Sequence, residues 1–382
     1  MTCAYKNLKI AILFANYGPY HLARVASAYQ AGKSRGWNVF GIELARSGEE
    51  YPWQTSVNNI PFKLITVCET SSYEKAPQFL LIQNLLKTLS QIKPDVLAIA
   101  GYSEPSMIAA FIWGKLNKKK LILLSESKAD DASRKFLKEW LKKQIIHNYH
   151  AAVVGGKPHT RYLQNLGMNL SSIAGGYDVV NNLVFHPDTI RVLPSPVNHP
   201  YFLTINRFVA KKNIPFILEA YAEYRGKLGN LAWDLVLCGD GELRSQIEAQ
   251  ITQLNLNAHV HLPGFLQENE IMPYFAHAKC FIHASIQEQW GLVVNEAMAA
   301  GLPVLVSNRC GCYEDLIIEG VNGFGFNPAC LSELVDLMIN TTQGKYDLPQ
   351  ISQAALNHIN QNFPIEKFGA GLLAAIDYNI RA

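Results

Sequence analysis

Two glutamates, Glu288 and Glu296, are separated by seven residues in a segment whose neighbours predict where each carboxylate lies. The apolar run before them, Lys279 to Ala284, predicts a short buried strand. Val293 to Ala300 predict a helix that ends at Gly301-Leu-Pro303. Glu288 is therefore expected in a loop, and Glu296 in the helix that follows it.

The chemistry open to these two residues follows from their types. A carboxylate can accept two hydrogen bonds at once, so it suits the vicinal diols of ribose and of hexoses. The amino end of a helix, with its free N–H groups and positive dipole, suits a phosphate group. The segment could thus bind a sugar, a diphosphate and a ribose together. The residues alone leave an alternative, in which Glu296 complements the first helical turn and Glu288 is a solvated loop residue.

The elements around the two acids predict that both face a crevice. Another apolar strand, Val304 to Ser307, follows the helix, so that strand, loop, helix and strand form a parallel βαβ unit. The loop after the first strand of such a unit lies at the carboxyl edge of the sheet, where open α/β folds bind their ligands.

The sequence around the acids closely resembles the retaining glycosyltransferases of family 4, which have the GT-B fold and carry a Glu, seven residues, Glu pattern. The likeness runs from about Tyr201 to Pro328, and its other motifs are Asn206-Arg-Phe-Val-Ala-Lys-Lys-Asn213, Leu237-Cys-Gly-Asp-Gly-Glu-Leu-Arg244, Leu262-Pro-Gly-Phe265 and Gly320-Val-Asn-Gly-Phe-Gly325. The resemblance implies transfer of a sugar, with retention of anomeric configuration, from a nucleoside diphosphate to an acceptor hydroxyl. We expect the nucleotide to be UDP in preference to GDP.

The expected fold class is α/β, with two doubly wound, Rossmann-like domains of the GT-B type and a crevice between them. Alternating apolar strands and helices support this class in both halves of the chain. We expect an acceptor-side domain at 1–195 and a nucleotide-sugar-binding domain at 196–363, joined by the proline-rich segment Arg191 to Pro200. By the resemblance, residues 364–382 form a helix that crosses back to the first domain.

Four side chains form the core of the expected site. By the resemblance, Glu296 holds the ribose hydroxyls and Glu288 holds hydroxyls of the donor sugar. Arg207 and Lys212 follow the first strand of the second domain, and their fixed positive charges would neutralise the diphosphate as the sugar leaves. Since no Asp-x-Asp motif occurs in the sequence, we expect a metal-independent transfer with no cofactor.

Other residues are candidates for donor contacts, and each has a structural alternative. Gly18, in the first strand-to-helix loop, would let backbone N–H groups approach a phosphate or a sugar. Trp290, Gly291 and Leu292 lie between the two acids, where their N–H groups could reach donor hydroxyls, although the Trp290 side chain could belong to the core. Gly239 is favoured as part of a tight turn beneath the base pocket.

The acceptor-side candidates lie in the first domain, where they follow or end predicted strands. His21 could contact an acceptor or merely begin a helix. Tyr102, Glu126 and Lys157 come at the ends of three later strands, and all three would reach the carboxyl edge of the sheet. The acceptor itself, whether a small molecule, a glycan or a lipid-linked sugar, is left open.

Composition indicates a globular protein, 49% hydrophobic and 17% charged, with no apolar run near the roughly 18 residues that span a bilayer. The amino terminus lacks a secretory signal, and the seven scattered cysteines are expected to be reduced thiols, which predicts a cytoplasmic protein. Residues 1–195 carry 23 Lys and Arg against 13 Asp and Glu, which points to two units with different partners. Nucleic acid is not an expected partner, because no basic tract interleaves with aromatic residues.

A basic amphipathic helix is predicted from Arg134 to His150, with one face made of Phe136, Leu137, Trp140, Leu141 and Ile145. We expect this face to pack against the sheet while the lysines face water. The alternative is peripheral contact with an anionic membrane surface that carries a lipid-linked acceptor, on the inner face of the membrane.

Two other functions would use the same residues. A glycosidase would employ the paired carboxylates as acid and nucleophile, and it would leave Arg207 and Lys212 without a role. A catalytically silent nucleotide-sugar-binding scaffold or sensor would keep the motifs of the second domain without acceptor chemistry. Release of UDP or GDP by the purified protein separates these alternatives from a transferase.

Overall fold

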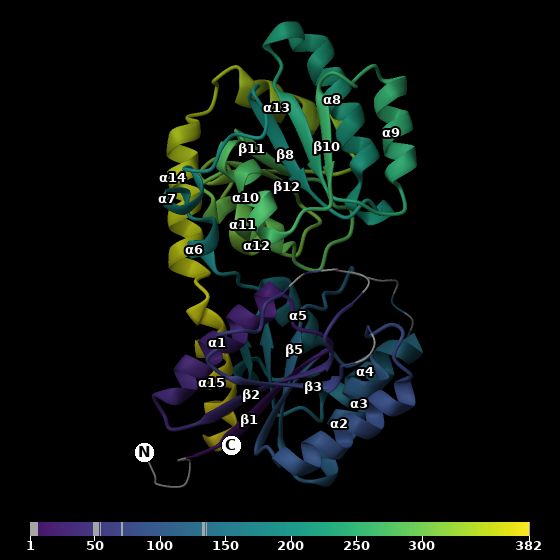
Figure 1. Cartoon of the computed structure of the whole chain (residues 1–382), viewed down its shortest axis with the longest axis vertical. Helices are drawn as coiled ribbons and strands as arrows, with labels where there is room; N and C mark the ends of the chain where they lie inside the picture. Colours follow the sequence, from purple (N-terminus) through teal and green to yellow (C-terminus); the bar gives the residue numbers. More distant parts are fainter. Residues whose placement is uncertain are drawn as a thin grey trace. The chain divides into compact units, whose positions relative to one another are not determined.

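The computed structural model describes residues 7–48, 53, 55–69, 72–131, 134 and 136–381. Internal contacts divide the chain into two compact units, each built around a parallel sheet (Figure 1). Unit 1 comprises Met1–Val180 and Ile365–Ala382, and unit 2 comprises Asn181–Pro364. The expected α/β class with two doubly wound, Rossmann-like domains is confirmed.

Unit 1 contains a sheet in which seven strands are found among the described residues, in the order β3-β2-β1-β4-β5-β6-β7. All neighbouring strands in it are parallel, and most central positions are fully buried, because helices cover both faces of such a sheet. The strands are β1 (Lys9–Phe14), β2 (Asn38–Ala45), β3 (Lys63–Cys68), β4 (Val96–Ala100), β5 (Lys120–Ser125), β6 (Ala151–Val154) and β7 (Ile173–Gly175).

The helices of unit 1 include the last one of the chain, which lies beside the first (Figure 1). Helix α15 approaches α1 and the end of β7 closely, since a Cβ at Gly371 would stand only 2.1 Å from the carbonyl oxygen of Gly175. The helices are α1 (Pro19–Lys33), α2 (Gln78–Ile92), α3 (Pro105–Leu116), α4 (Phe136–Ile146), α5 (Lys157–Asn165), the 3₁₀ turn η2 (Leu170–Ser172) and α15 (Glu366–Arg381).

Unit 2 contains a parallel sheet with the order β10-β9-β8-β11-β12-β13 in the described part of the chain. Its strands are β8 (Tyr201–Ile205), β9 (Asp234–Cys238), β10 (Val260–Gly264), β11 (Cys280–His283), β12 (Val304–Ser307) and β13 (Gly323–Phe326). Its helices are α6 (Asn182–Phe185), α7 (Pro187–Ile190), η3 (Ala210–Lys212), α8 (Ile214–Leu228), η4 (Gly229–Leu231), α9 (Arg244–Gln253), α10 (Glu268–His277), α11 (Leu292–Ala299), α12 (Tyr313–Leu316), α13 (Leu331–Thr342) and α14 (Leu348–Asn362).

The first boundary between the units falls at Val180, before the expected position at 195. The reason is that α6 packs within unit 2. The Asn182 side-chain amide donates to the carbonyl of Ile359 at 3.2 Å, and the Phe185 ring lies 5.5 Å from that of Phe275. The segment expected to be a linker also has a contact in unit 2, because His277 bonds to the Leu193 carbonyl at 2.7 Å.

Each sheet has a topological switch point next to its first strand. In unit 1, β1 lies between β2 and β4, and in unit 2, β8 lies between β9 and β11. The chain therefore leaves β1 and β4, or β8 and β11, toward opposite faces of the sheet, and the loops at the carboxyl ends diverge there. Such a point is where open α/β sheets bind their ligands.

Helix α4 corrects one expectation. The face made of Phe136, Leu137, Trp140, Leu141 and Ile145 was expected to pack against the sheet, but the first four side chains are exposed, Phe136 to 89%. Ile145 is half-buried and packs against the core, and Ile146 beside it is fully buried. The cause is that Glu139 and Lys142, on the opposite side of α4, bond to Tyr162 of α5 and turn the apolar face outward.

Candidate functional site

The carboxyl ends of β8 and β11 bring a cation and a carboxylate together in unit 2. Lys212 ends the turn η3 after β8, and Glu288 lies in the loop after β11. The two loops are tied by a backbone bond from the Ile286 N–H to the Lys211 carbonyl at 2.9 Å. The Lys212 ammonium forms an ion pair with the Glu288 carboxylate, in which the two side chains are 13% and 12% exposed.

Three donors converge on one oxygen of Glu288. Besides Lys212, the Ser285 hydroxyl donates to Oε2 at 3.0 Å, and His283 Nε2 lies 3.2 Å from the same atom. Within the described residues no hydrogen bond reaches the other oxygen, Oε1. Glu288 is therefore held firmly through one oxygen and can accept hydrogen bonds through the other, which rules out the alternative of a solvated loop residue.

The charges in this group follow from burial and pairing. Burial alone would raise the pKa of Glu288, but the Lys212 ammonium and the hydrogen bond from His283 outweigh it and hold that pKa well below its usual range. Burial lowers the pKa of His283, although its bond to Glu288 acts in the opposite direction. The low pKa keeps Glu288 ionised, and burial favours the neutral form of His283.

Gly291 lets α11 begin directly beside this group. It is the residue before the helix and has a φ of +103°, a conformation that side chains rarely adopt. A Cβ at this position would stand 3.3 Å from His283 Nε2 and 3.4 Å from Glu288 Cγ, so a side chain would crowd both. Leu292, also predicted for the site, is the first residue of α11 and is half-buried.

The Trp290 side chain belongs to the core, as one of the two interpretations held. It is 1% exposed, its indole N–H donates to Asn295 at 2.8 Å, and its ring lies 6.1 Å from that of Phe363. The Trp290 carbonyl accepts a bond from the Cys312 N–H at 3.1 Å. The Trp290 side chain is therefore not available to a donor, and a contact through its backbone stays a prediction.

Glu296 lies inside α11 and is 5% exposed. It is the fifth residue of the helix, beyond the first turn, so the alternative in which it complements that turn is wrong. Arg207 follows β8 by two residues and is half-buried. The roles assigned to these two side chains, in ribose and diphosphate binding, stay predictions.

Gly239 forms the tight turn that was favoured for it. It follows β9 with a φ of +136°, and a Cβ there would stand 1.8 Å from the Asn206 carbonyl oxygen. Its N–H donates to the Gly264 carbonyl at 2.7 Å. Only a glycine can pack this closely against the loop after β8, and Gly239 thereby supports the loop that carries Arg207 and Lys212.

In unit 1, Gly18 and His21 are bonded to each other at the start of α1. The Gly18 N–H donates to His21 Nδ1 at 3.2 Å, and the imidazole packs 4.4 Å from the Phe14 ring. Burial, with a smaller effect of Arg24, lowers the pKa of His21 to about 3, so the ring stays neutral. His21 therefore caps the helix, and a ligand contact through the Gly18 N–H would have to replace this bond.

The other acceptor-side candidates are at the ends of β4, β5 and β6, as expected. Tyr102 is 7% exposed, and burial raises the pKa of its hydroxyl, which shares hydrogen bonds with Ser127 and Tyr162. Glu126 is half-buried and interacts with Asp178. Lys157 is the exposed first residue of α5.

The residues that sequence reasoning missed are His283 and Ser285. Both lie in or just after the apolar run that predicted β11, so they were taken only as part of a strand. A polar residue at the carboxyl end of a buried parallel strand is a usable signal, because that end faces the ligand edge of the sheet. No group of three or more His, Cys, Asp or Glu side chains that could hold a metal ion is found in the described ranges.

Comparisons with known proteins agree with this geometry. Residues 186–355 match the family model for glycosyl transferases group 1. The chain is 25% identical over 231 residues to alpha-monoglucosyldiacylglycerol synthase of Acholeplasma laidlawii, and 25% identical over 214 residues to 2-deoxystreptamine N-acetyl-D-glucosaminyltransferase of Niallia circulans. These matches cover 54% and 55% of this chain, and the chain spans only 56% and 54% of the two relatives.

Solved structures with the same fold cover nearly the whole chain. A glycosyltransferase from Rickettsia africae has a TM-score of 0.75 at 17% identity, covering 99% of this chain and 100% of that one. Anabaena Alr3699/HepE, in complex with UDP and glucose, has a TM-score of 0.73 at 16% identity, covering 97% and 100%. The chain thus has the GT-B fold, and its residues 186–355 match the family model for glycosyl transferases group 1.

Proposed function

We propose that this protein is a retaining glycosyltransferase that moves a sugar from a nucleoside diphosphate sugar, with UDP preferred to GDP, to an acceptor hydroxyl. The observation that carries the proposal is the group of Lys212, Glu288, His283 and Ser285 at the switch point of the sheet in unit 2. The match of residues 186–355 to glycosyl transferases group 1 supports it, as does the shared fold with a protein solved with UDP-glucose.

The nucleotide sugar would bind to both members of the Lys212–Glu288 pair, its phosphate to the lysine and its sugar to the glutamate. An ammonium has three N–H donors, so Lys212 can keep Glu288 and still donate to a phosphate oxygen. Arg207 and the first N–H groups of α11 would supply further positive charge to the diphosphate. Glu288 would accept a hydrogen bond from a hydroxyl of the donor sugar through Oε1, and Glu296 would accept hydrogen bonds from the ribose hydroxyls.

The reaction itself would need few protein groups. The bond between the anomeric carbon and the diphosphate oxygen breaks, and the acceptor oxygen bonds to the same face of that carbon. The acceptor proton passes to the leaving phosphate oxygen, so no protein base is required. Lys212 and Arg207 would stabilise the negative charge that develops on the diphosphate, in a metal-independent manner.

The electrostatics exclude Glu288 as the acid of a glycosidase. A glycosidase needs one carboxyl with a raised pKa that gives a proton to the leaving group. Glu288 has the opposite property, because the Lys212 ammonium holds its pKa low despite burial. A carboxylate that stays ionised suits the binding of hydroxyls better than the donation of a proton.

The direct experiment measures UDP release by the purified protein from UDP-sugars, in excess EDTA and with candidate acceptors, and determines the anomer of the product by NMR. We expect acceptor-dependent release with retained configuration. Activity that is lost in EDTA and restored by Mg²⁺ or Mn²⁺ would contradict the metal-independent mechanism. Tight UDP binding by calorimetry without turnover of any donor would instead favour a silent scaffold or sensor.

A second experiment addresses Glu296. We expect Glu296→Ala to weaken UDP binding by about 1–3 kcal/mol, because a buried hydrogen-bonded contact to the ribose is lost. Calorimetric titration of UDP measures this, with Glu223→Ala, an exposed glutamate on α8, as the matched control. Equal affinities for both variants and the unaltered protein would refute the assignment of Glu296.

A further inference from the structure

The apolar side chains of α4 lie on the outside of unit 1. Phe136, Leu137, Trp140 and Leu141 are 89%, 66%, 49% and 49% exposed. Because successive residues of an α-helix turn by about 100°, these four fall within roughly 140° of one face. The exposed side chains thus form a single apolar stripe, which we call the α4 face, and not isolated surface residues.

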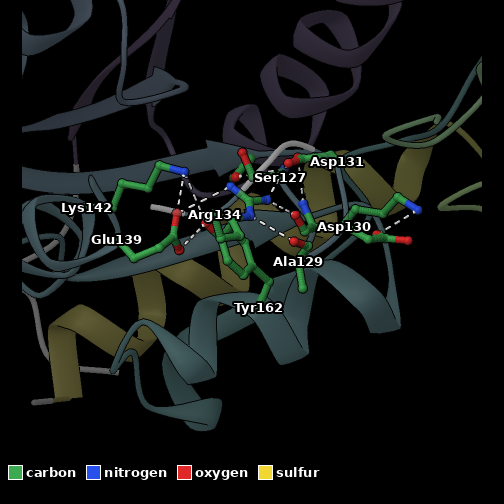
Figure 2. A network of polar contacts seen from close by, with 10 residues as sticks. Ser127, Ala129, Asp130, Asp131, Arg134, Glu139, Lys142 and Tyr162 are labelled. Atoms are coloured by element: carbon green, nitrogen blue, oxygen red, sulfur yellow. Dashed lines mark hydrogen bonds and ion pairs between the residues drawn. The ribbon is translucent and has the colours of Figure 1, made fainter. Parts of the chain in front are cut away.

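Polar side chains on the other side of α4 form a network of contacts with the rest of unit 1 (Figure 2). Tyr162 of α5 donates its hydroxyl to the Glu139 carboxylate at 2.8 Å, and Lys142 donates to the same carboxylate at 2.9 Å. Arg134 reaches Glu139 at 3.5 Å, and its guanidinium lies 4.5 Å from the centroid of the Tyr162 ring. The inner side of the helix therefore presents Glu139 and Lys142 to the protein beside the buried Ile146, while the larger apolar stripe faces outward.

Arg134 also fastens the start of α4 to the segment after β5. Its guanidinium donates to the carbonyls of Lys128 and Ala129 and to the carboxylate of Asp131 (Figure 2). Lys128 is itself 4% exposed and pairs with Asp130 at 3.0 Å. The orientation of α4 is thus set by several bonds at its first turn and along its inner side, so the outward apolar face is a fixed feature of unit 1.

Lysines border the α4 face on both sides. By the same helical rotation, Lys143 lies next to Phe136 at one edge and Lys138 lies beyond Leu141 at the other. Both lysines are exposed. Positive charge flanking an apolar centre complements a surface that is negatively charged outside and apolar beneath.

We propose that the α4 face docks unit 1 on an anionic lipid bilayer, with the helix lying in the plane of the interface. No helix in the described part of the chain is long and apolar enough to cross a membrane, and docking requires none to do so. A second copy of the chain is a poorer occupant, because a two-fold contact through this face would set its lysines against those of the partner. The proposal goes beyond the transfer of a sugar and does not depend on it.

The test is flotation of the full-length protein with vesicles of phosphatidylcholine, alone or with about 30% phosphatidylglycerol. We expect binding to the anionic vesicles only. The double variant Phe136→Ser with Trp140→Ser should bind about ten-fold more weakly or worse, since both apolar anchors are lost. Reversal of charge in Lys138→Glu with Lys143→Glu should also weaken binding.

The matched control replaces two leucines of unit 2, Leu183→Ser with Leu231→Ser, which are 74% and 73% exposed, and it should bind as the unaltered protein does. Thermal unfolding of each variant checks that the fold is kept. The proposal is overturned if the unaltered protein does not float with anionic vesicles, or if the α4 variants float equally well. It is also overturned if sedimentation without lipid shows a dimer that Phe136→Ser with Trp140→Ser dissociates, which would assign the face to a second copy.

Discussion

Both units place a cation beside a carboxylate at the carboxyl edge of a parallel sheet, but the two pairs differ in accessibility. In unit 2, Lys212 and Glu288 are 13% and 12% exposed. In unit 1, Arg24 and Asp178 lie 3.5 Å apart and are 1% and 0% exposed. The first pair can still be reached by a ligand, whereas the second is enclosed.

The partners of the enclosed pair are structural ones. Arg24 donates through Nε to the Val179 carbonyl at 3.0 Å, and its guanidinium lies 4.9 Å from the centroid of the Tyr177 ring. These contacts join α1 to the segment after β7. A cation and an acidic side chain at the carboxyl edge of a sheet are thus candidates for ligand binding only where both remain reachable, and an enclosed pair of this kind can stabilise the fold instead.

The two acids, Asp178 and Glu288, also differ in the direction of their pKa shifts. Burial, and to a lesser degree the charge of Glu126, raises the pKa of Asp178 well above its usual range, and Arg24 only partly opposes this. The pKa of Glu288 is instead lowered, because the Lys212 ammonium outweighs burial. One fold therefore holds one carboxyl group that favours the protonated form and another that favours the ionised form.

The largest effect is expected in the enclosed pair. Arg24→Met should destabilise the protein by about 3–5 kcal/mol, because it removes the buried partner of Asp178 and the donor to the Val179 carbonyl. Urea unfolding followed by circular dichroism measures the change. A loss below about 1 kcal/mol would mean that Arg24 does not hold the fold of unit 1 together.

A change in the reachable pair, Lys212 and Glu288, should lower the turnover of the donor sugar. Lys212→Met is expected to lower turnover of a UDP-sugar by about 10²- to 10³-fold, since one positive charge on the leaving diphosphate is removed. The matched control is Lys211→Met, which removes an exposed lysine from the same turn. Equal turnover in the two variants would place the diphosphate elsewhere.

A smaller effect should follow from crowding the reachable pair. Gly291→Ala puts a Cβ near His283 and Glu288 and strains a positive φ, which together should cost about 1–3 kcal/mol in donor binding or stability. Gly344→Ala is the control, because its φ is +72° and nothing lies within 4 Å of its added Cβ. If calorimetry gives the same UDP affinity for both variants, only strain matters and the crowding of Glu288 does not.

The smallest effect concerns pH. Asp178 has a raised pKa in the folded state, so stability should fall as pH rises above the unfolded value of about 3.9. Glu288 has a lowered pKa, so its contribution is present above the unfolded value of about 4.3 and is lost as pH falls toward the folded value. Each effect is at most about 1.4 kcal/mol per pH unit.

Urea unfolding of Asp178→Asn and Glu288→Gln between about pH 3 and 7 separates the two, because the unfolded pKa values of both acids fall inside or near that range. Relative to the unaltered protein, Asp178→Asn should gain stability as pH rises, and Glu288→Gln should lose it. Shifts of the same sign in the two variants would contradict the opposite environments described here.

Much of the fold could be predicted from the sequence, because buried parallel strands appear as short apolar runs between helices. The strands expected from Lys279 to Ala284 and from Val304 to Ser307 are found as β11 and β12. The expected boundary at 195 differs from the end of the first segment of unit 1 at Val180, because α6 and α7 are too short to show a periodic pattern. Their place in unit 2 depends on contacts such as that of Asn182 with α14, which local sequence does not reveal.

The site could be predicted in part. Strand order places the loops after β8 and β11 side by side, so Lys212 and Glu288 could be expected to lie close together. His283 was missed because a lone histidine in an apolar strand gives no sign of its partner. The outward face of α4 was missed because periodicity predicts that a helix has an apolar side but not whether that side faces protein or solvent.

The most direct measurement of the central claim is a crystal structure of the protein with UDP bound. We predict the diphosphate within hydrogen-bonding distance of Lys212 and Arg207, at the amino end of α11, with the ribose hydroxyls on Glu296. UDP bound away from the carboxyl ends of β8 and β11, with the Lys212–Glu288 pair untouched, would contradict it.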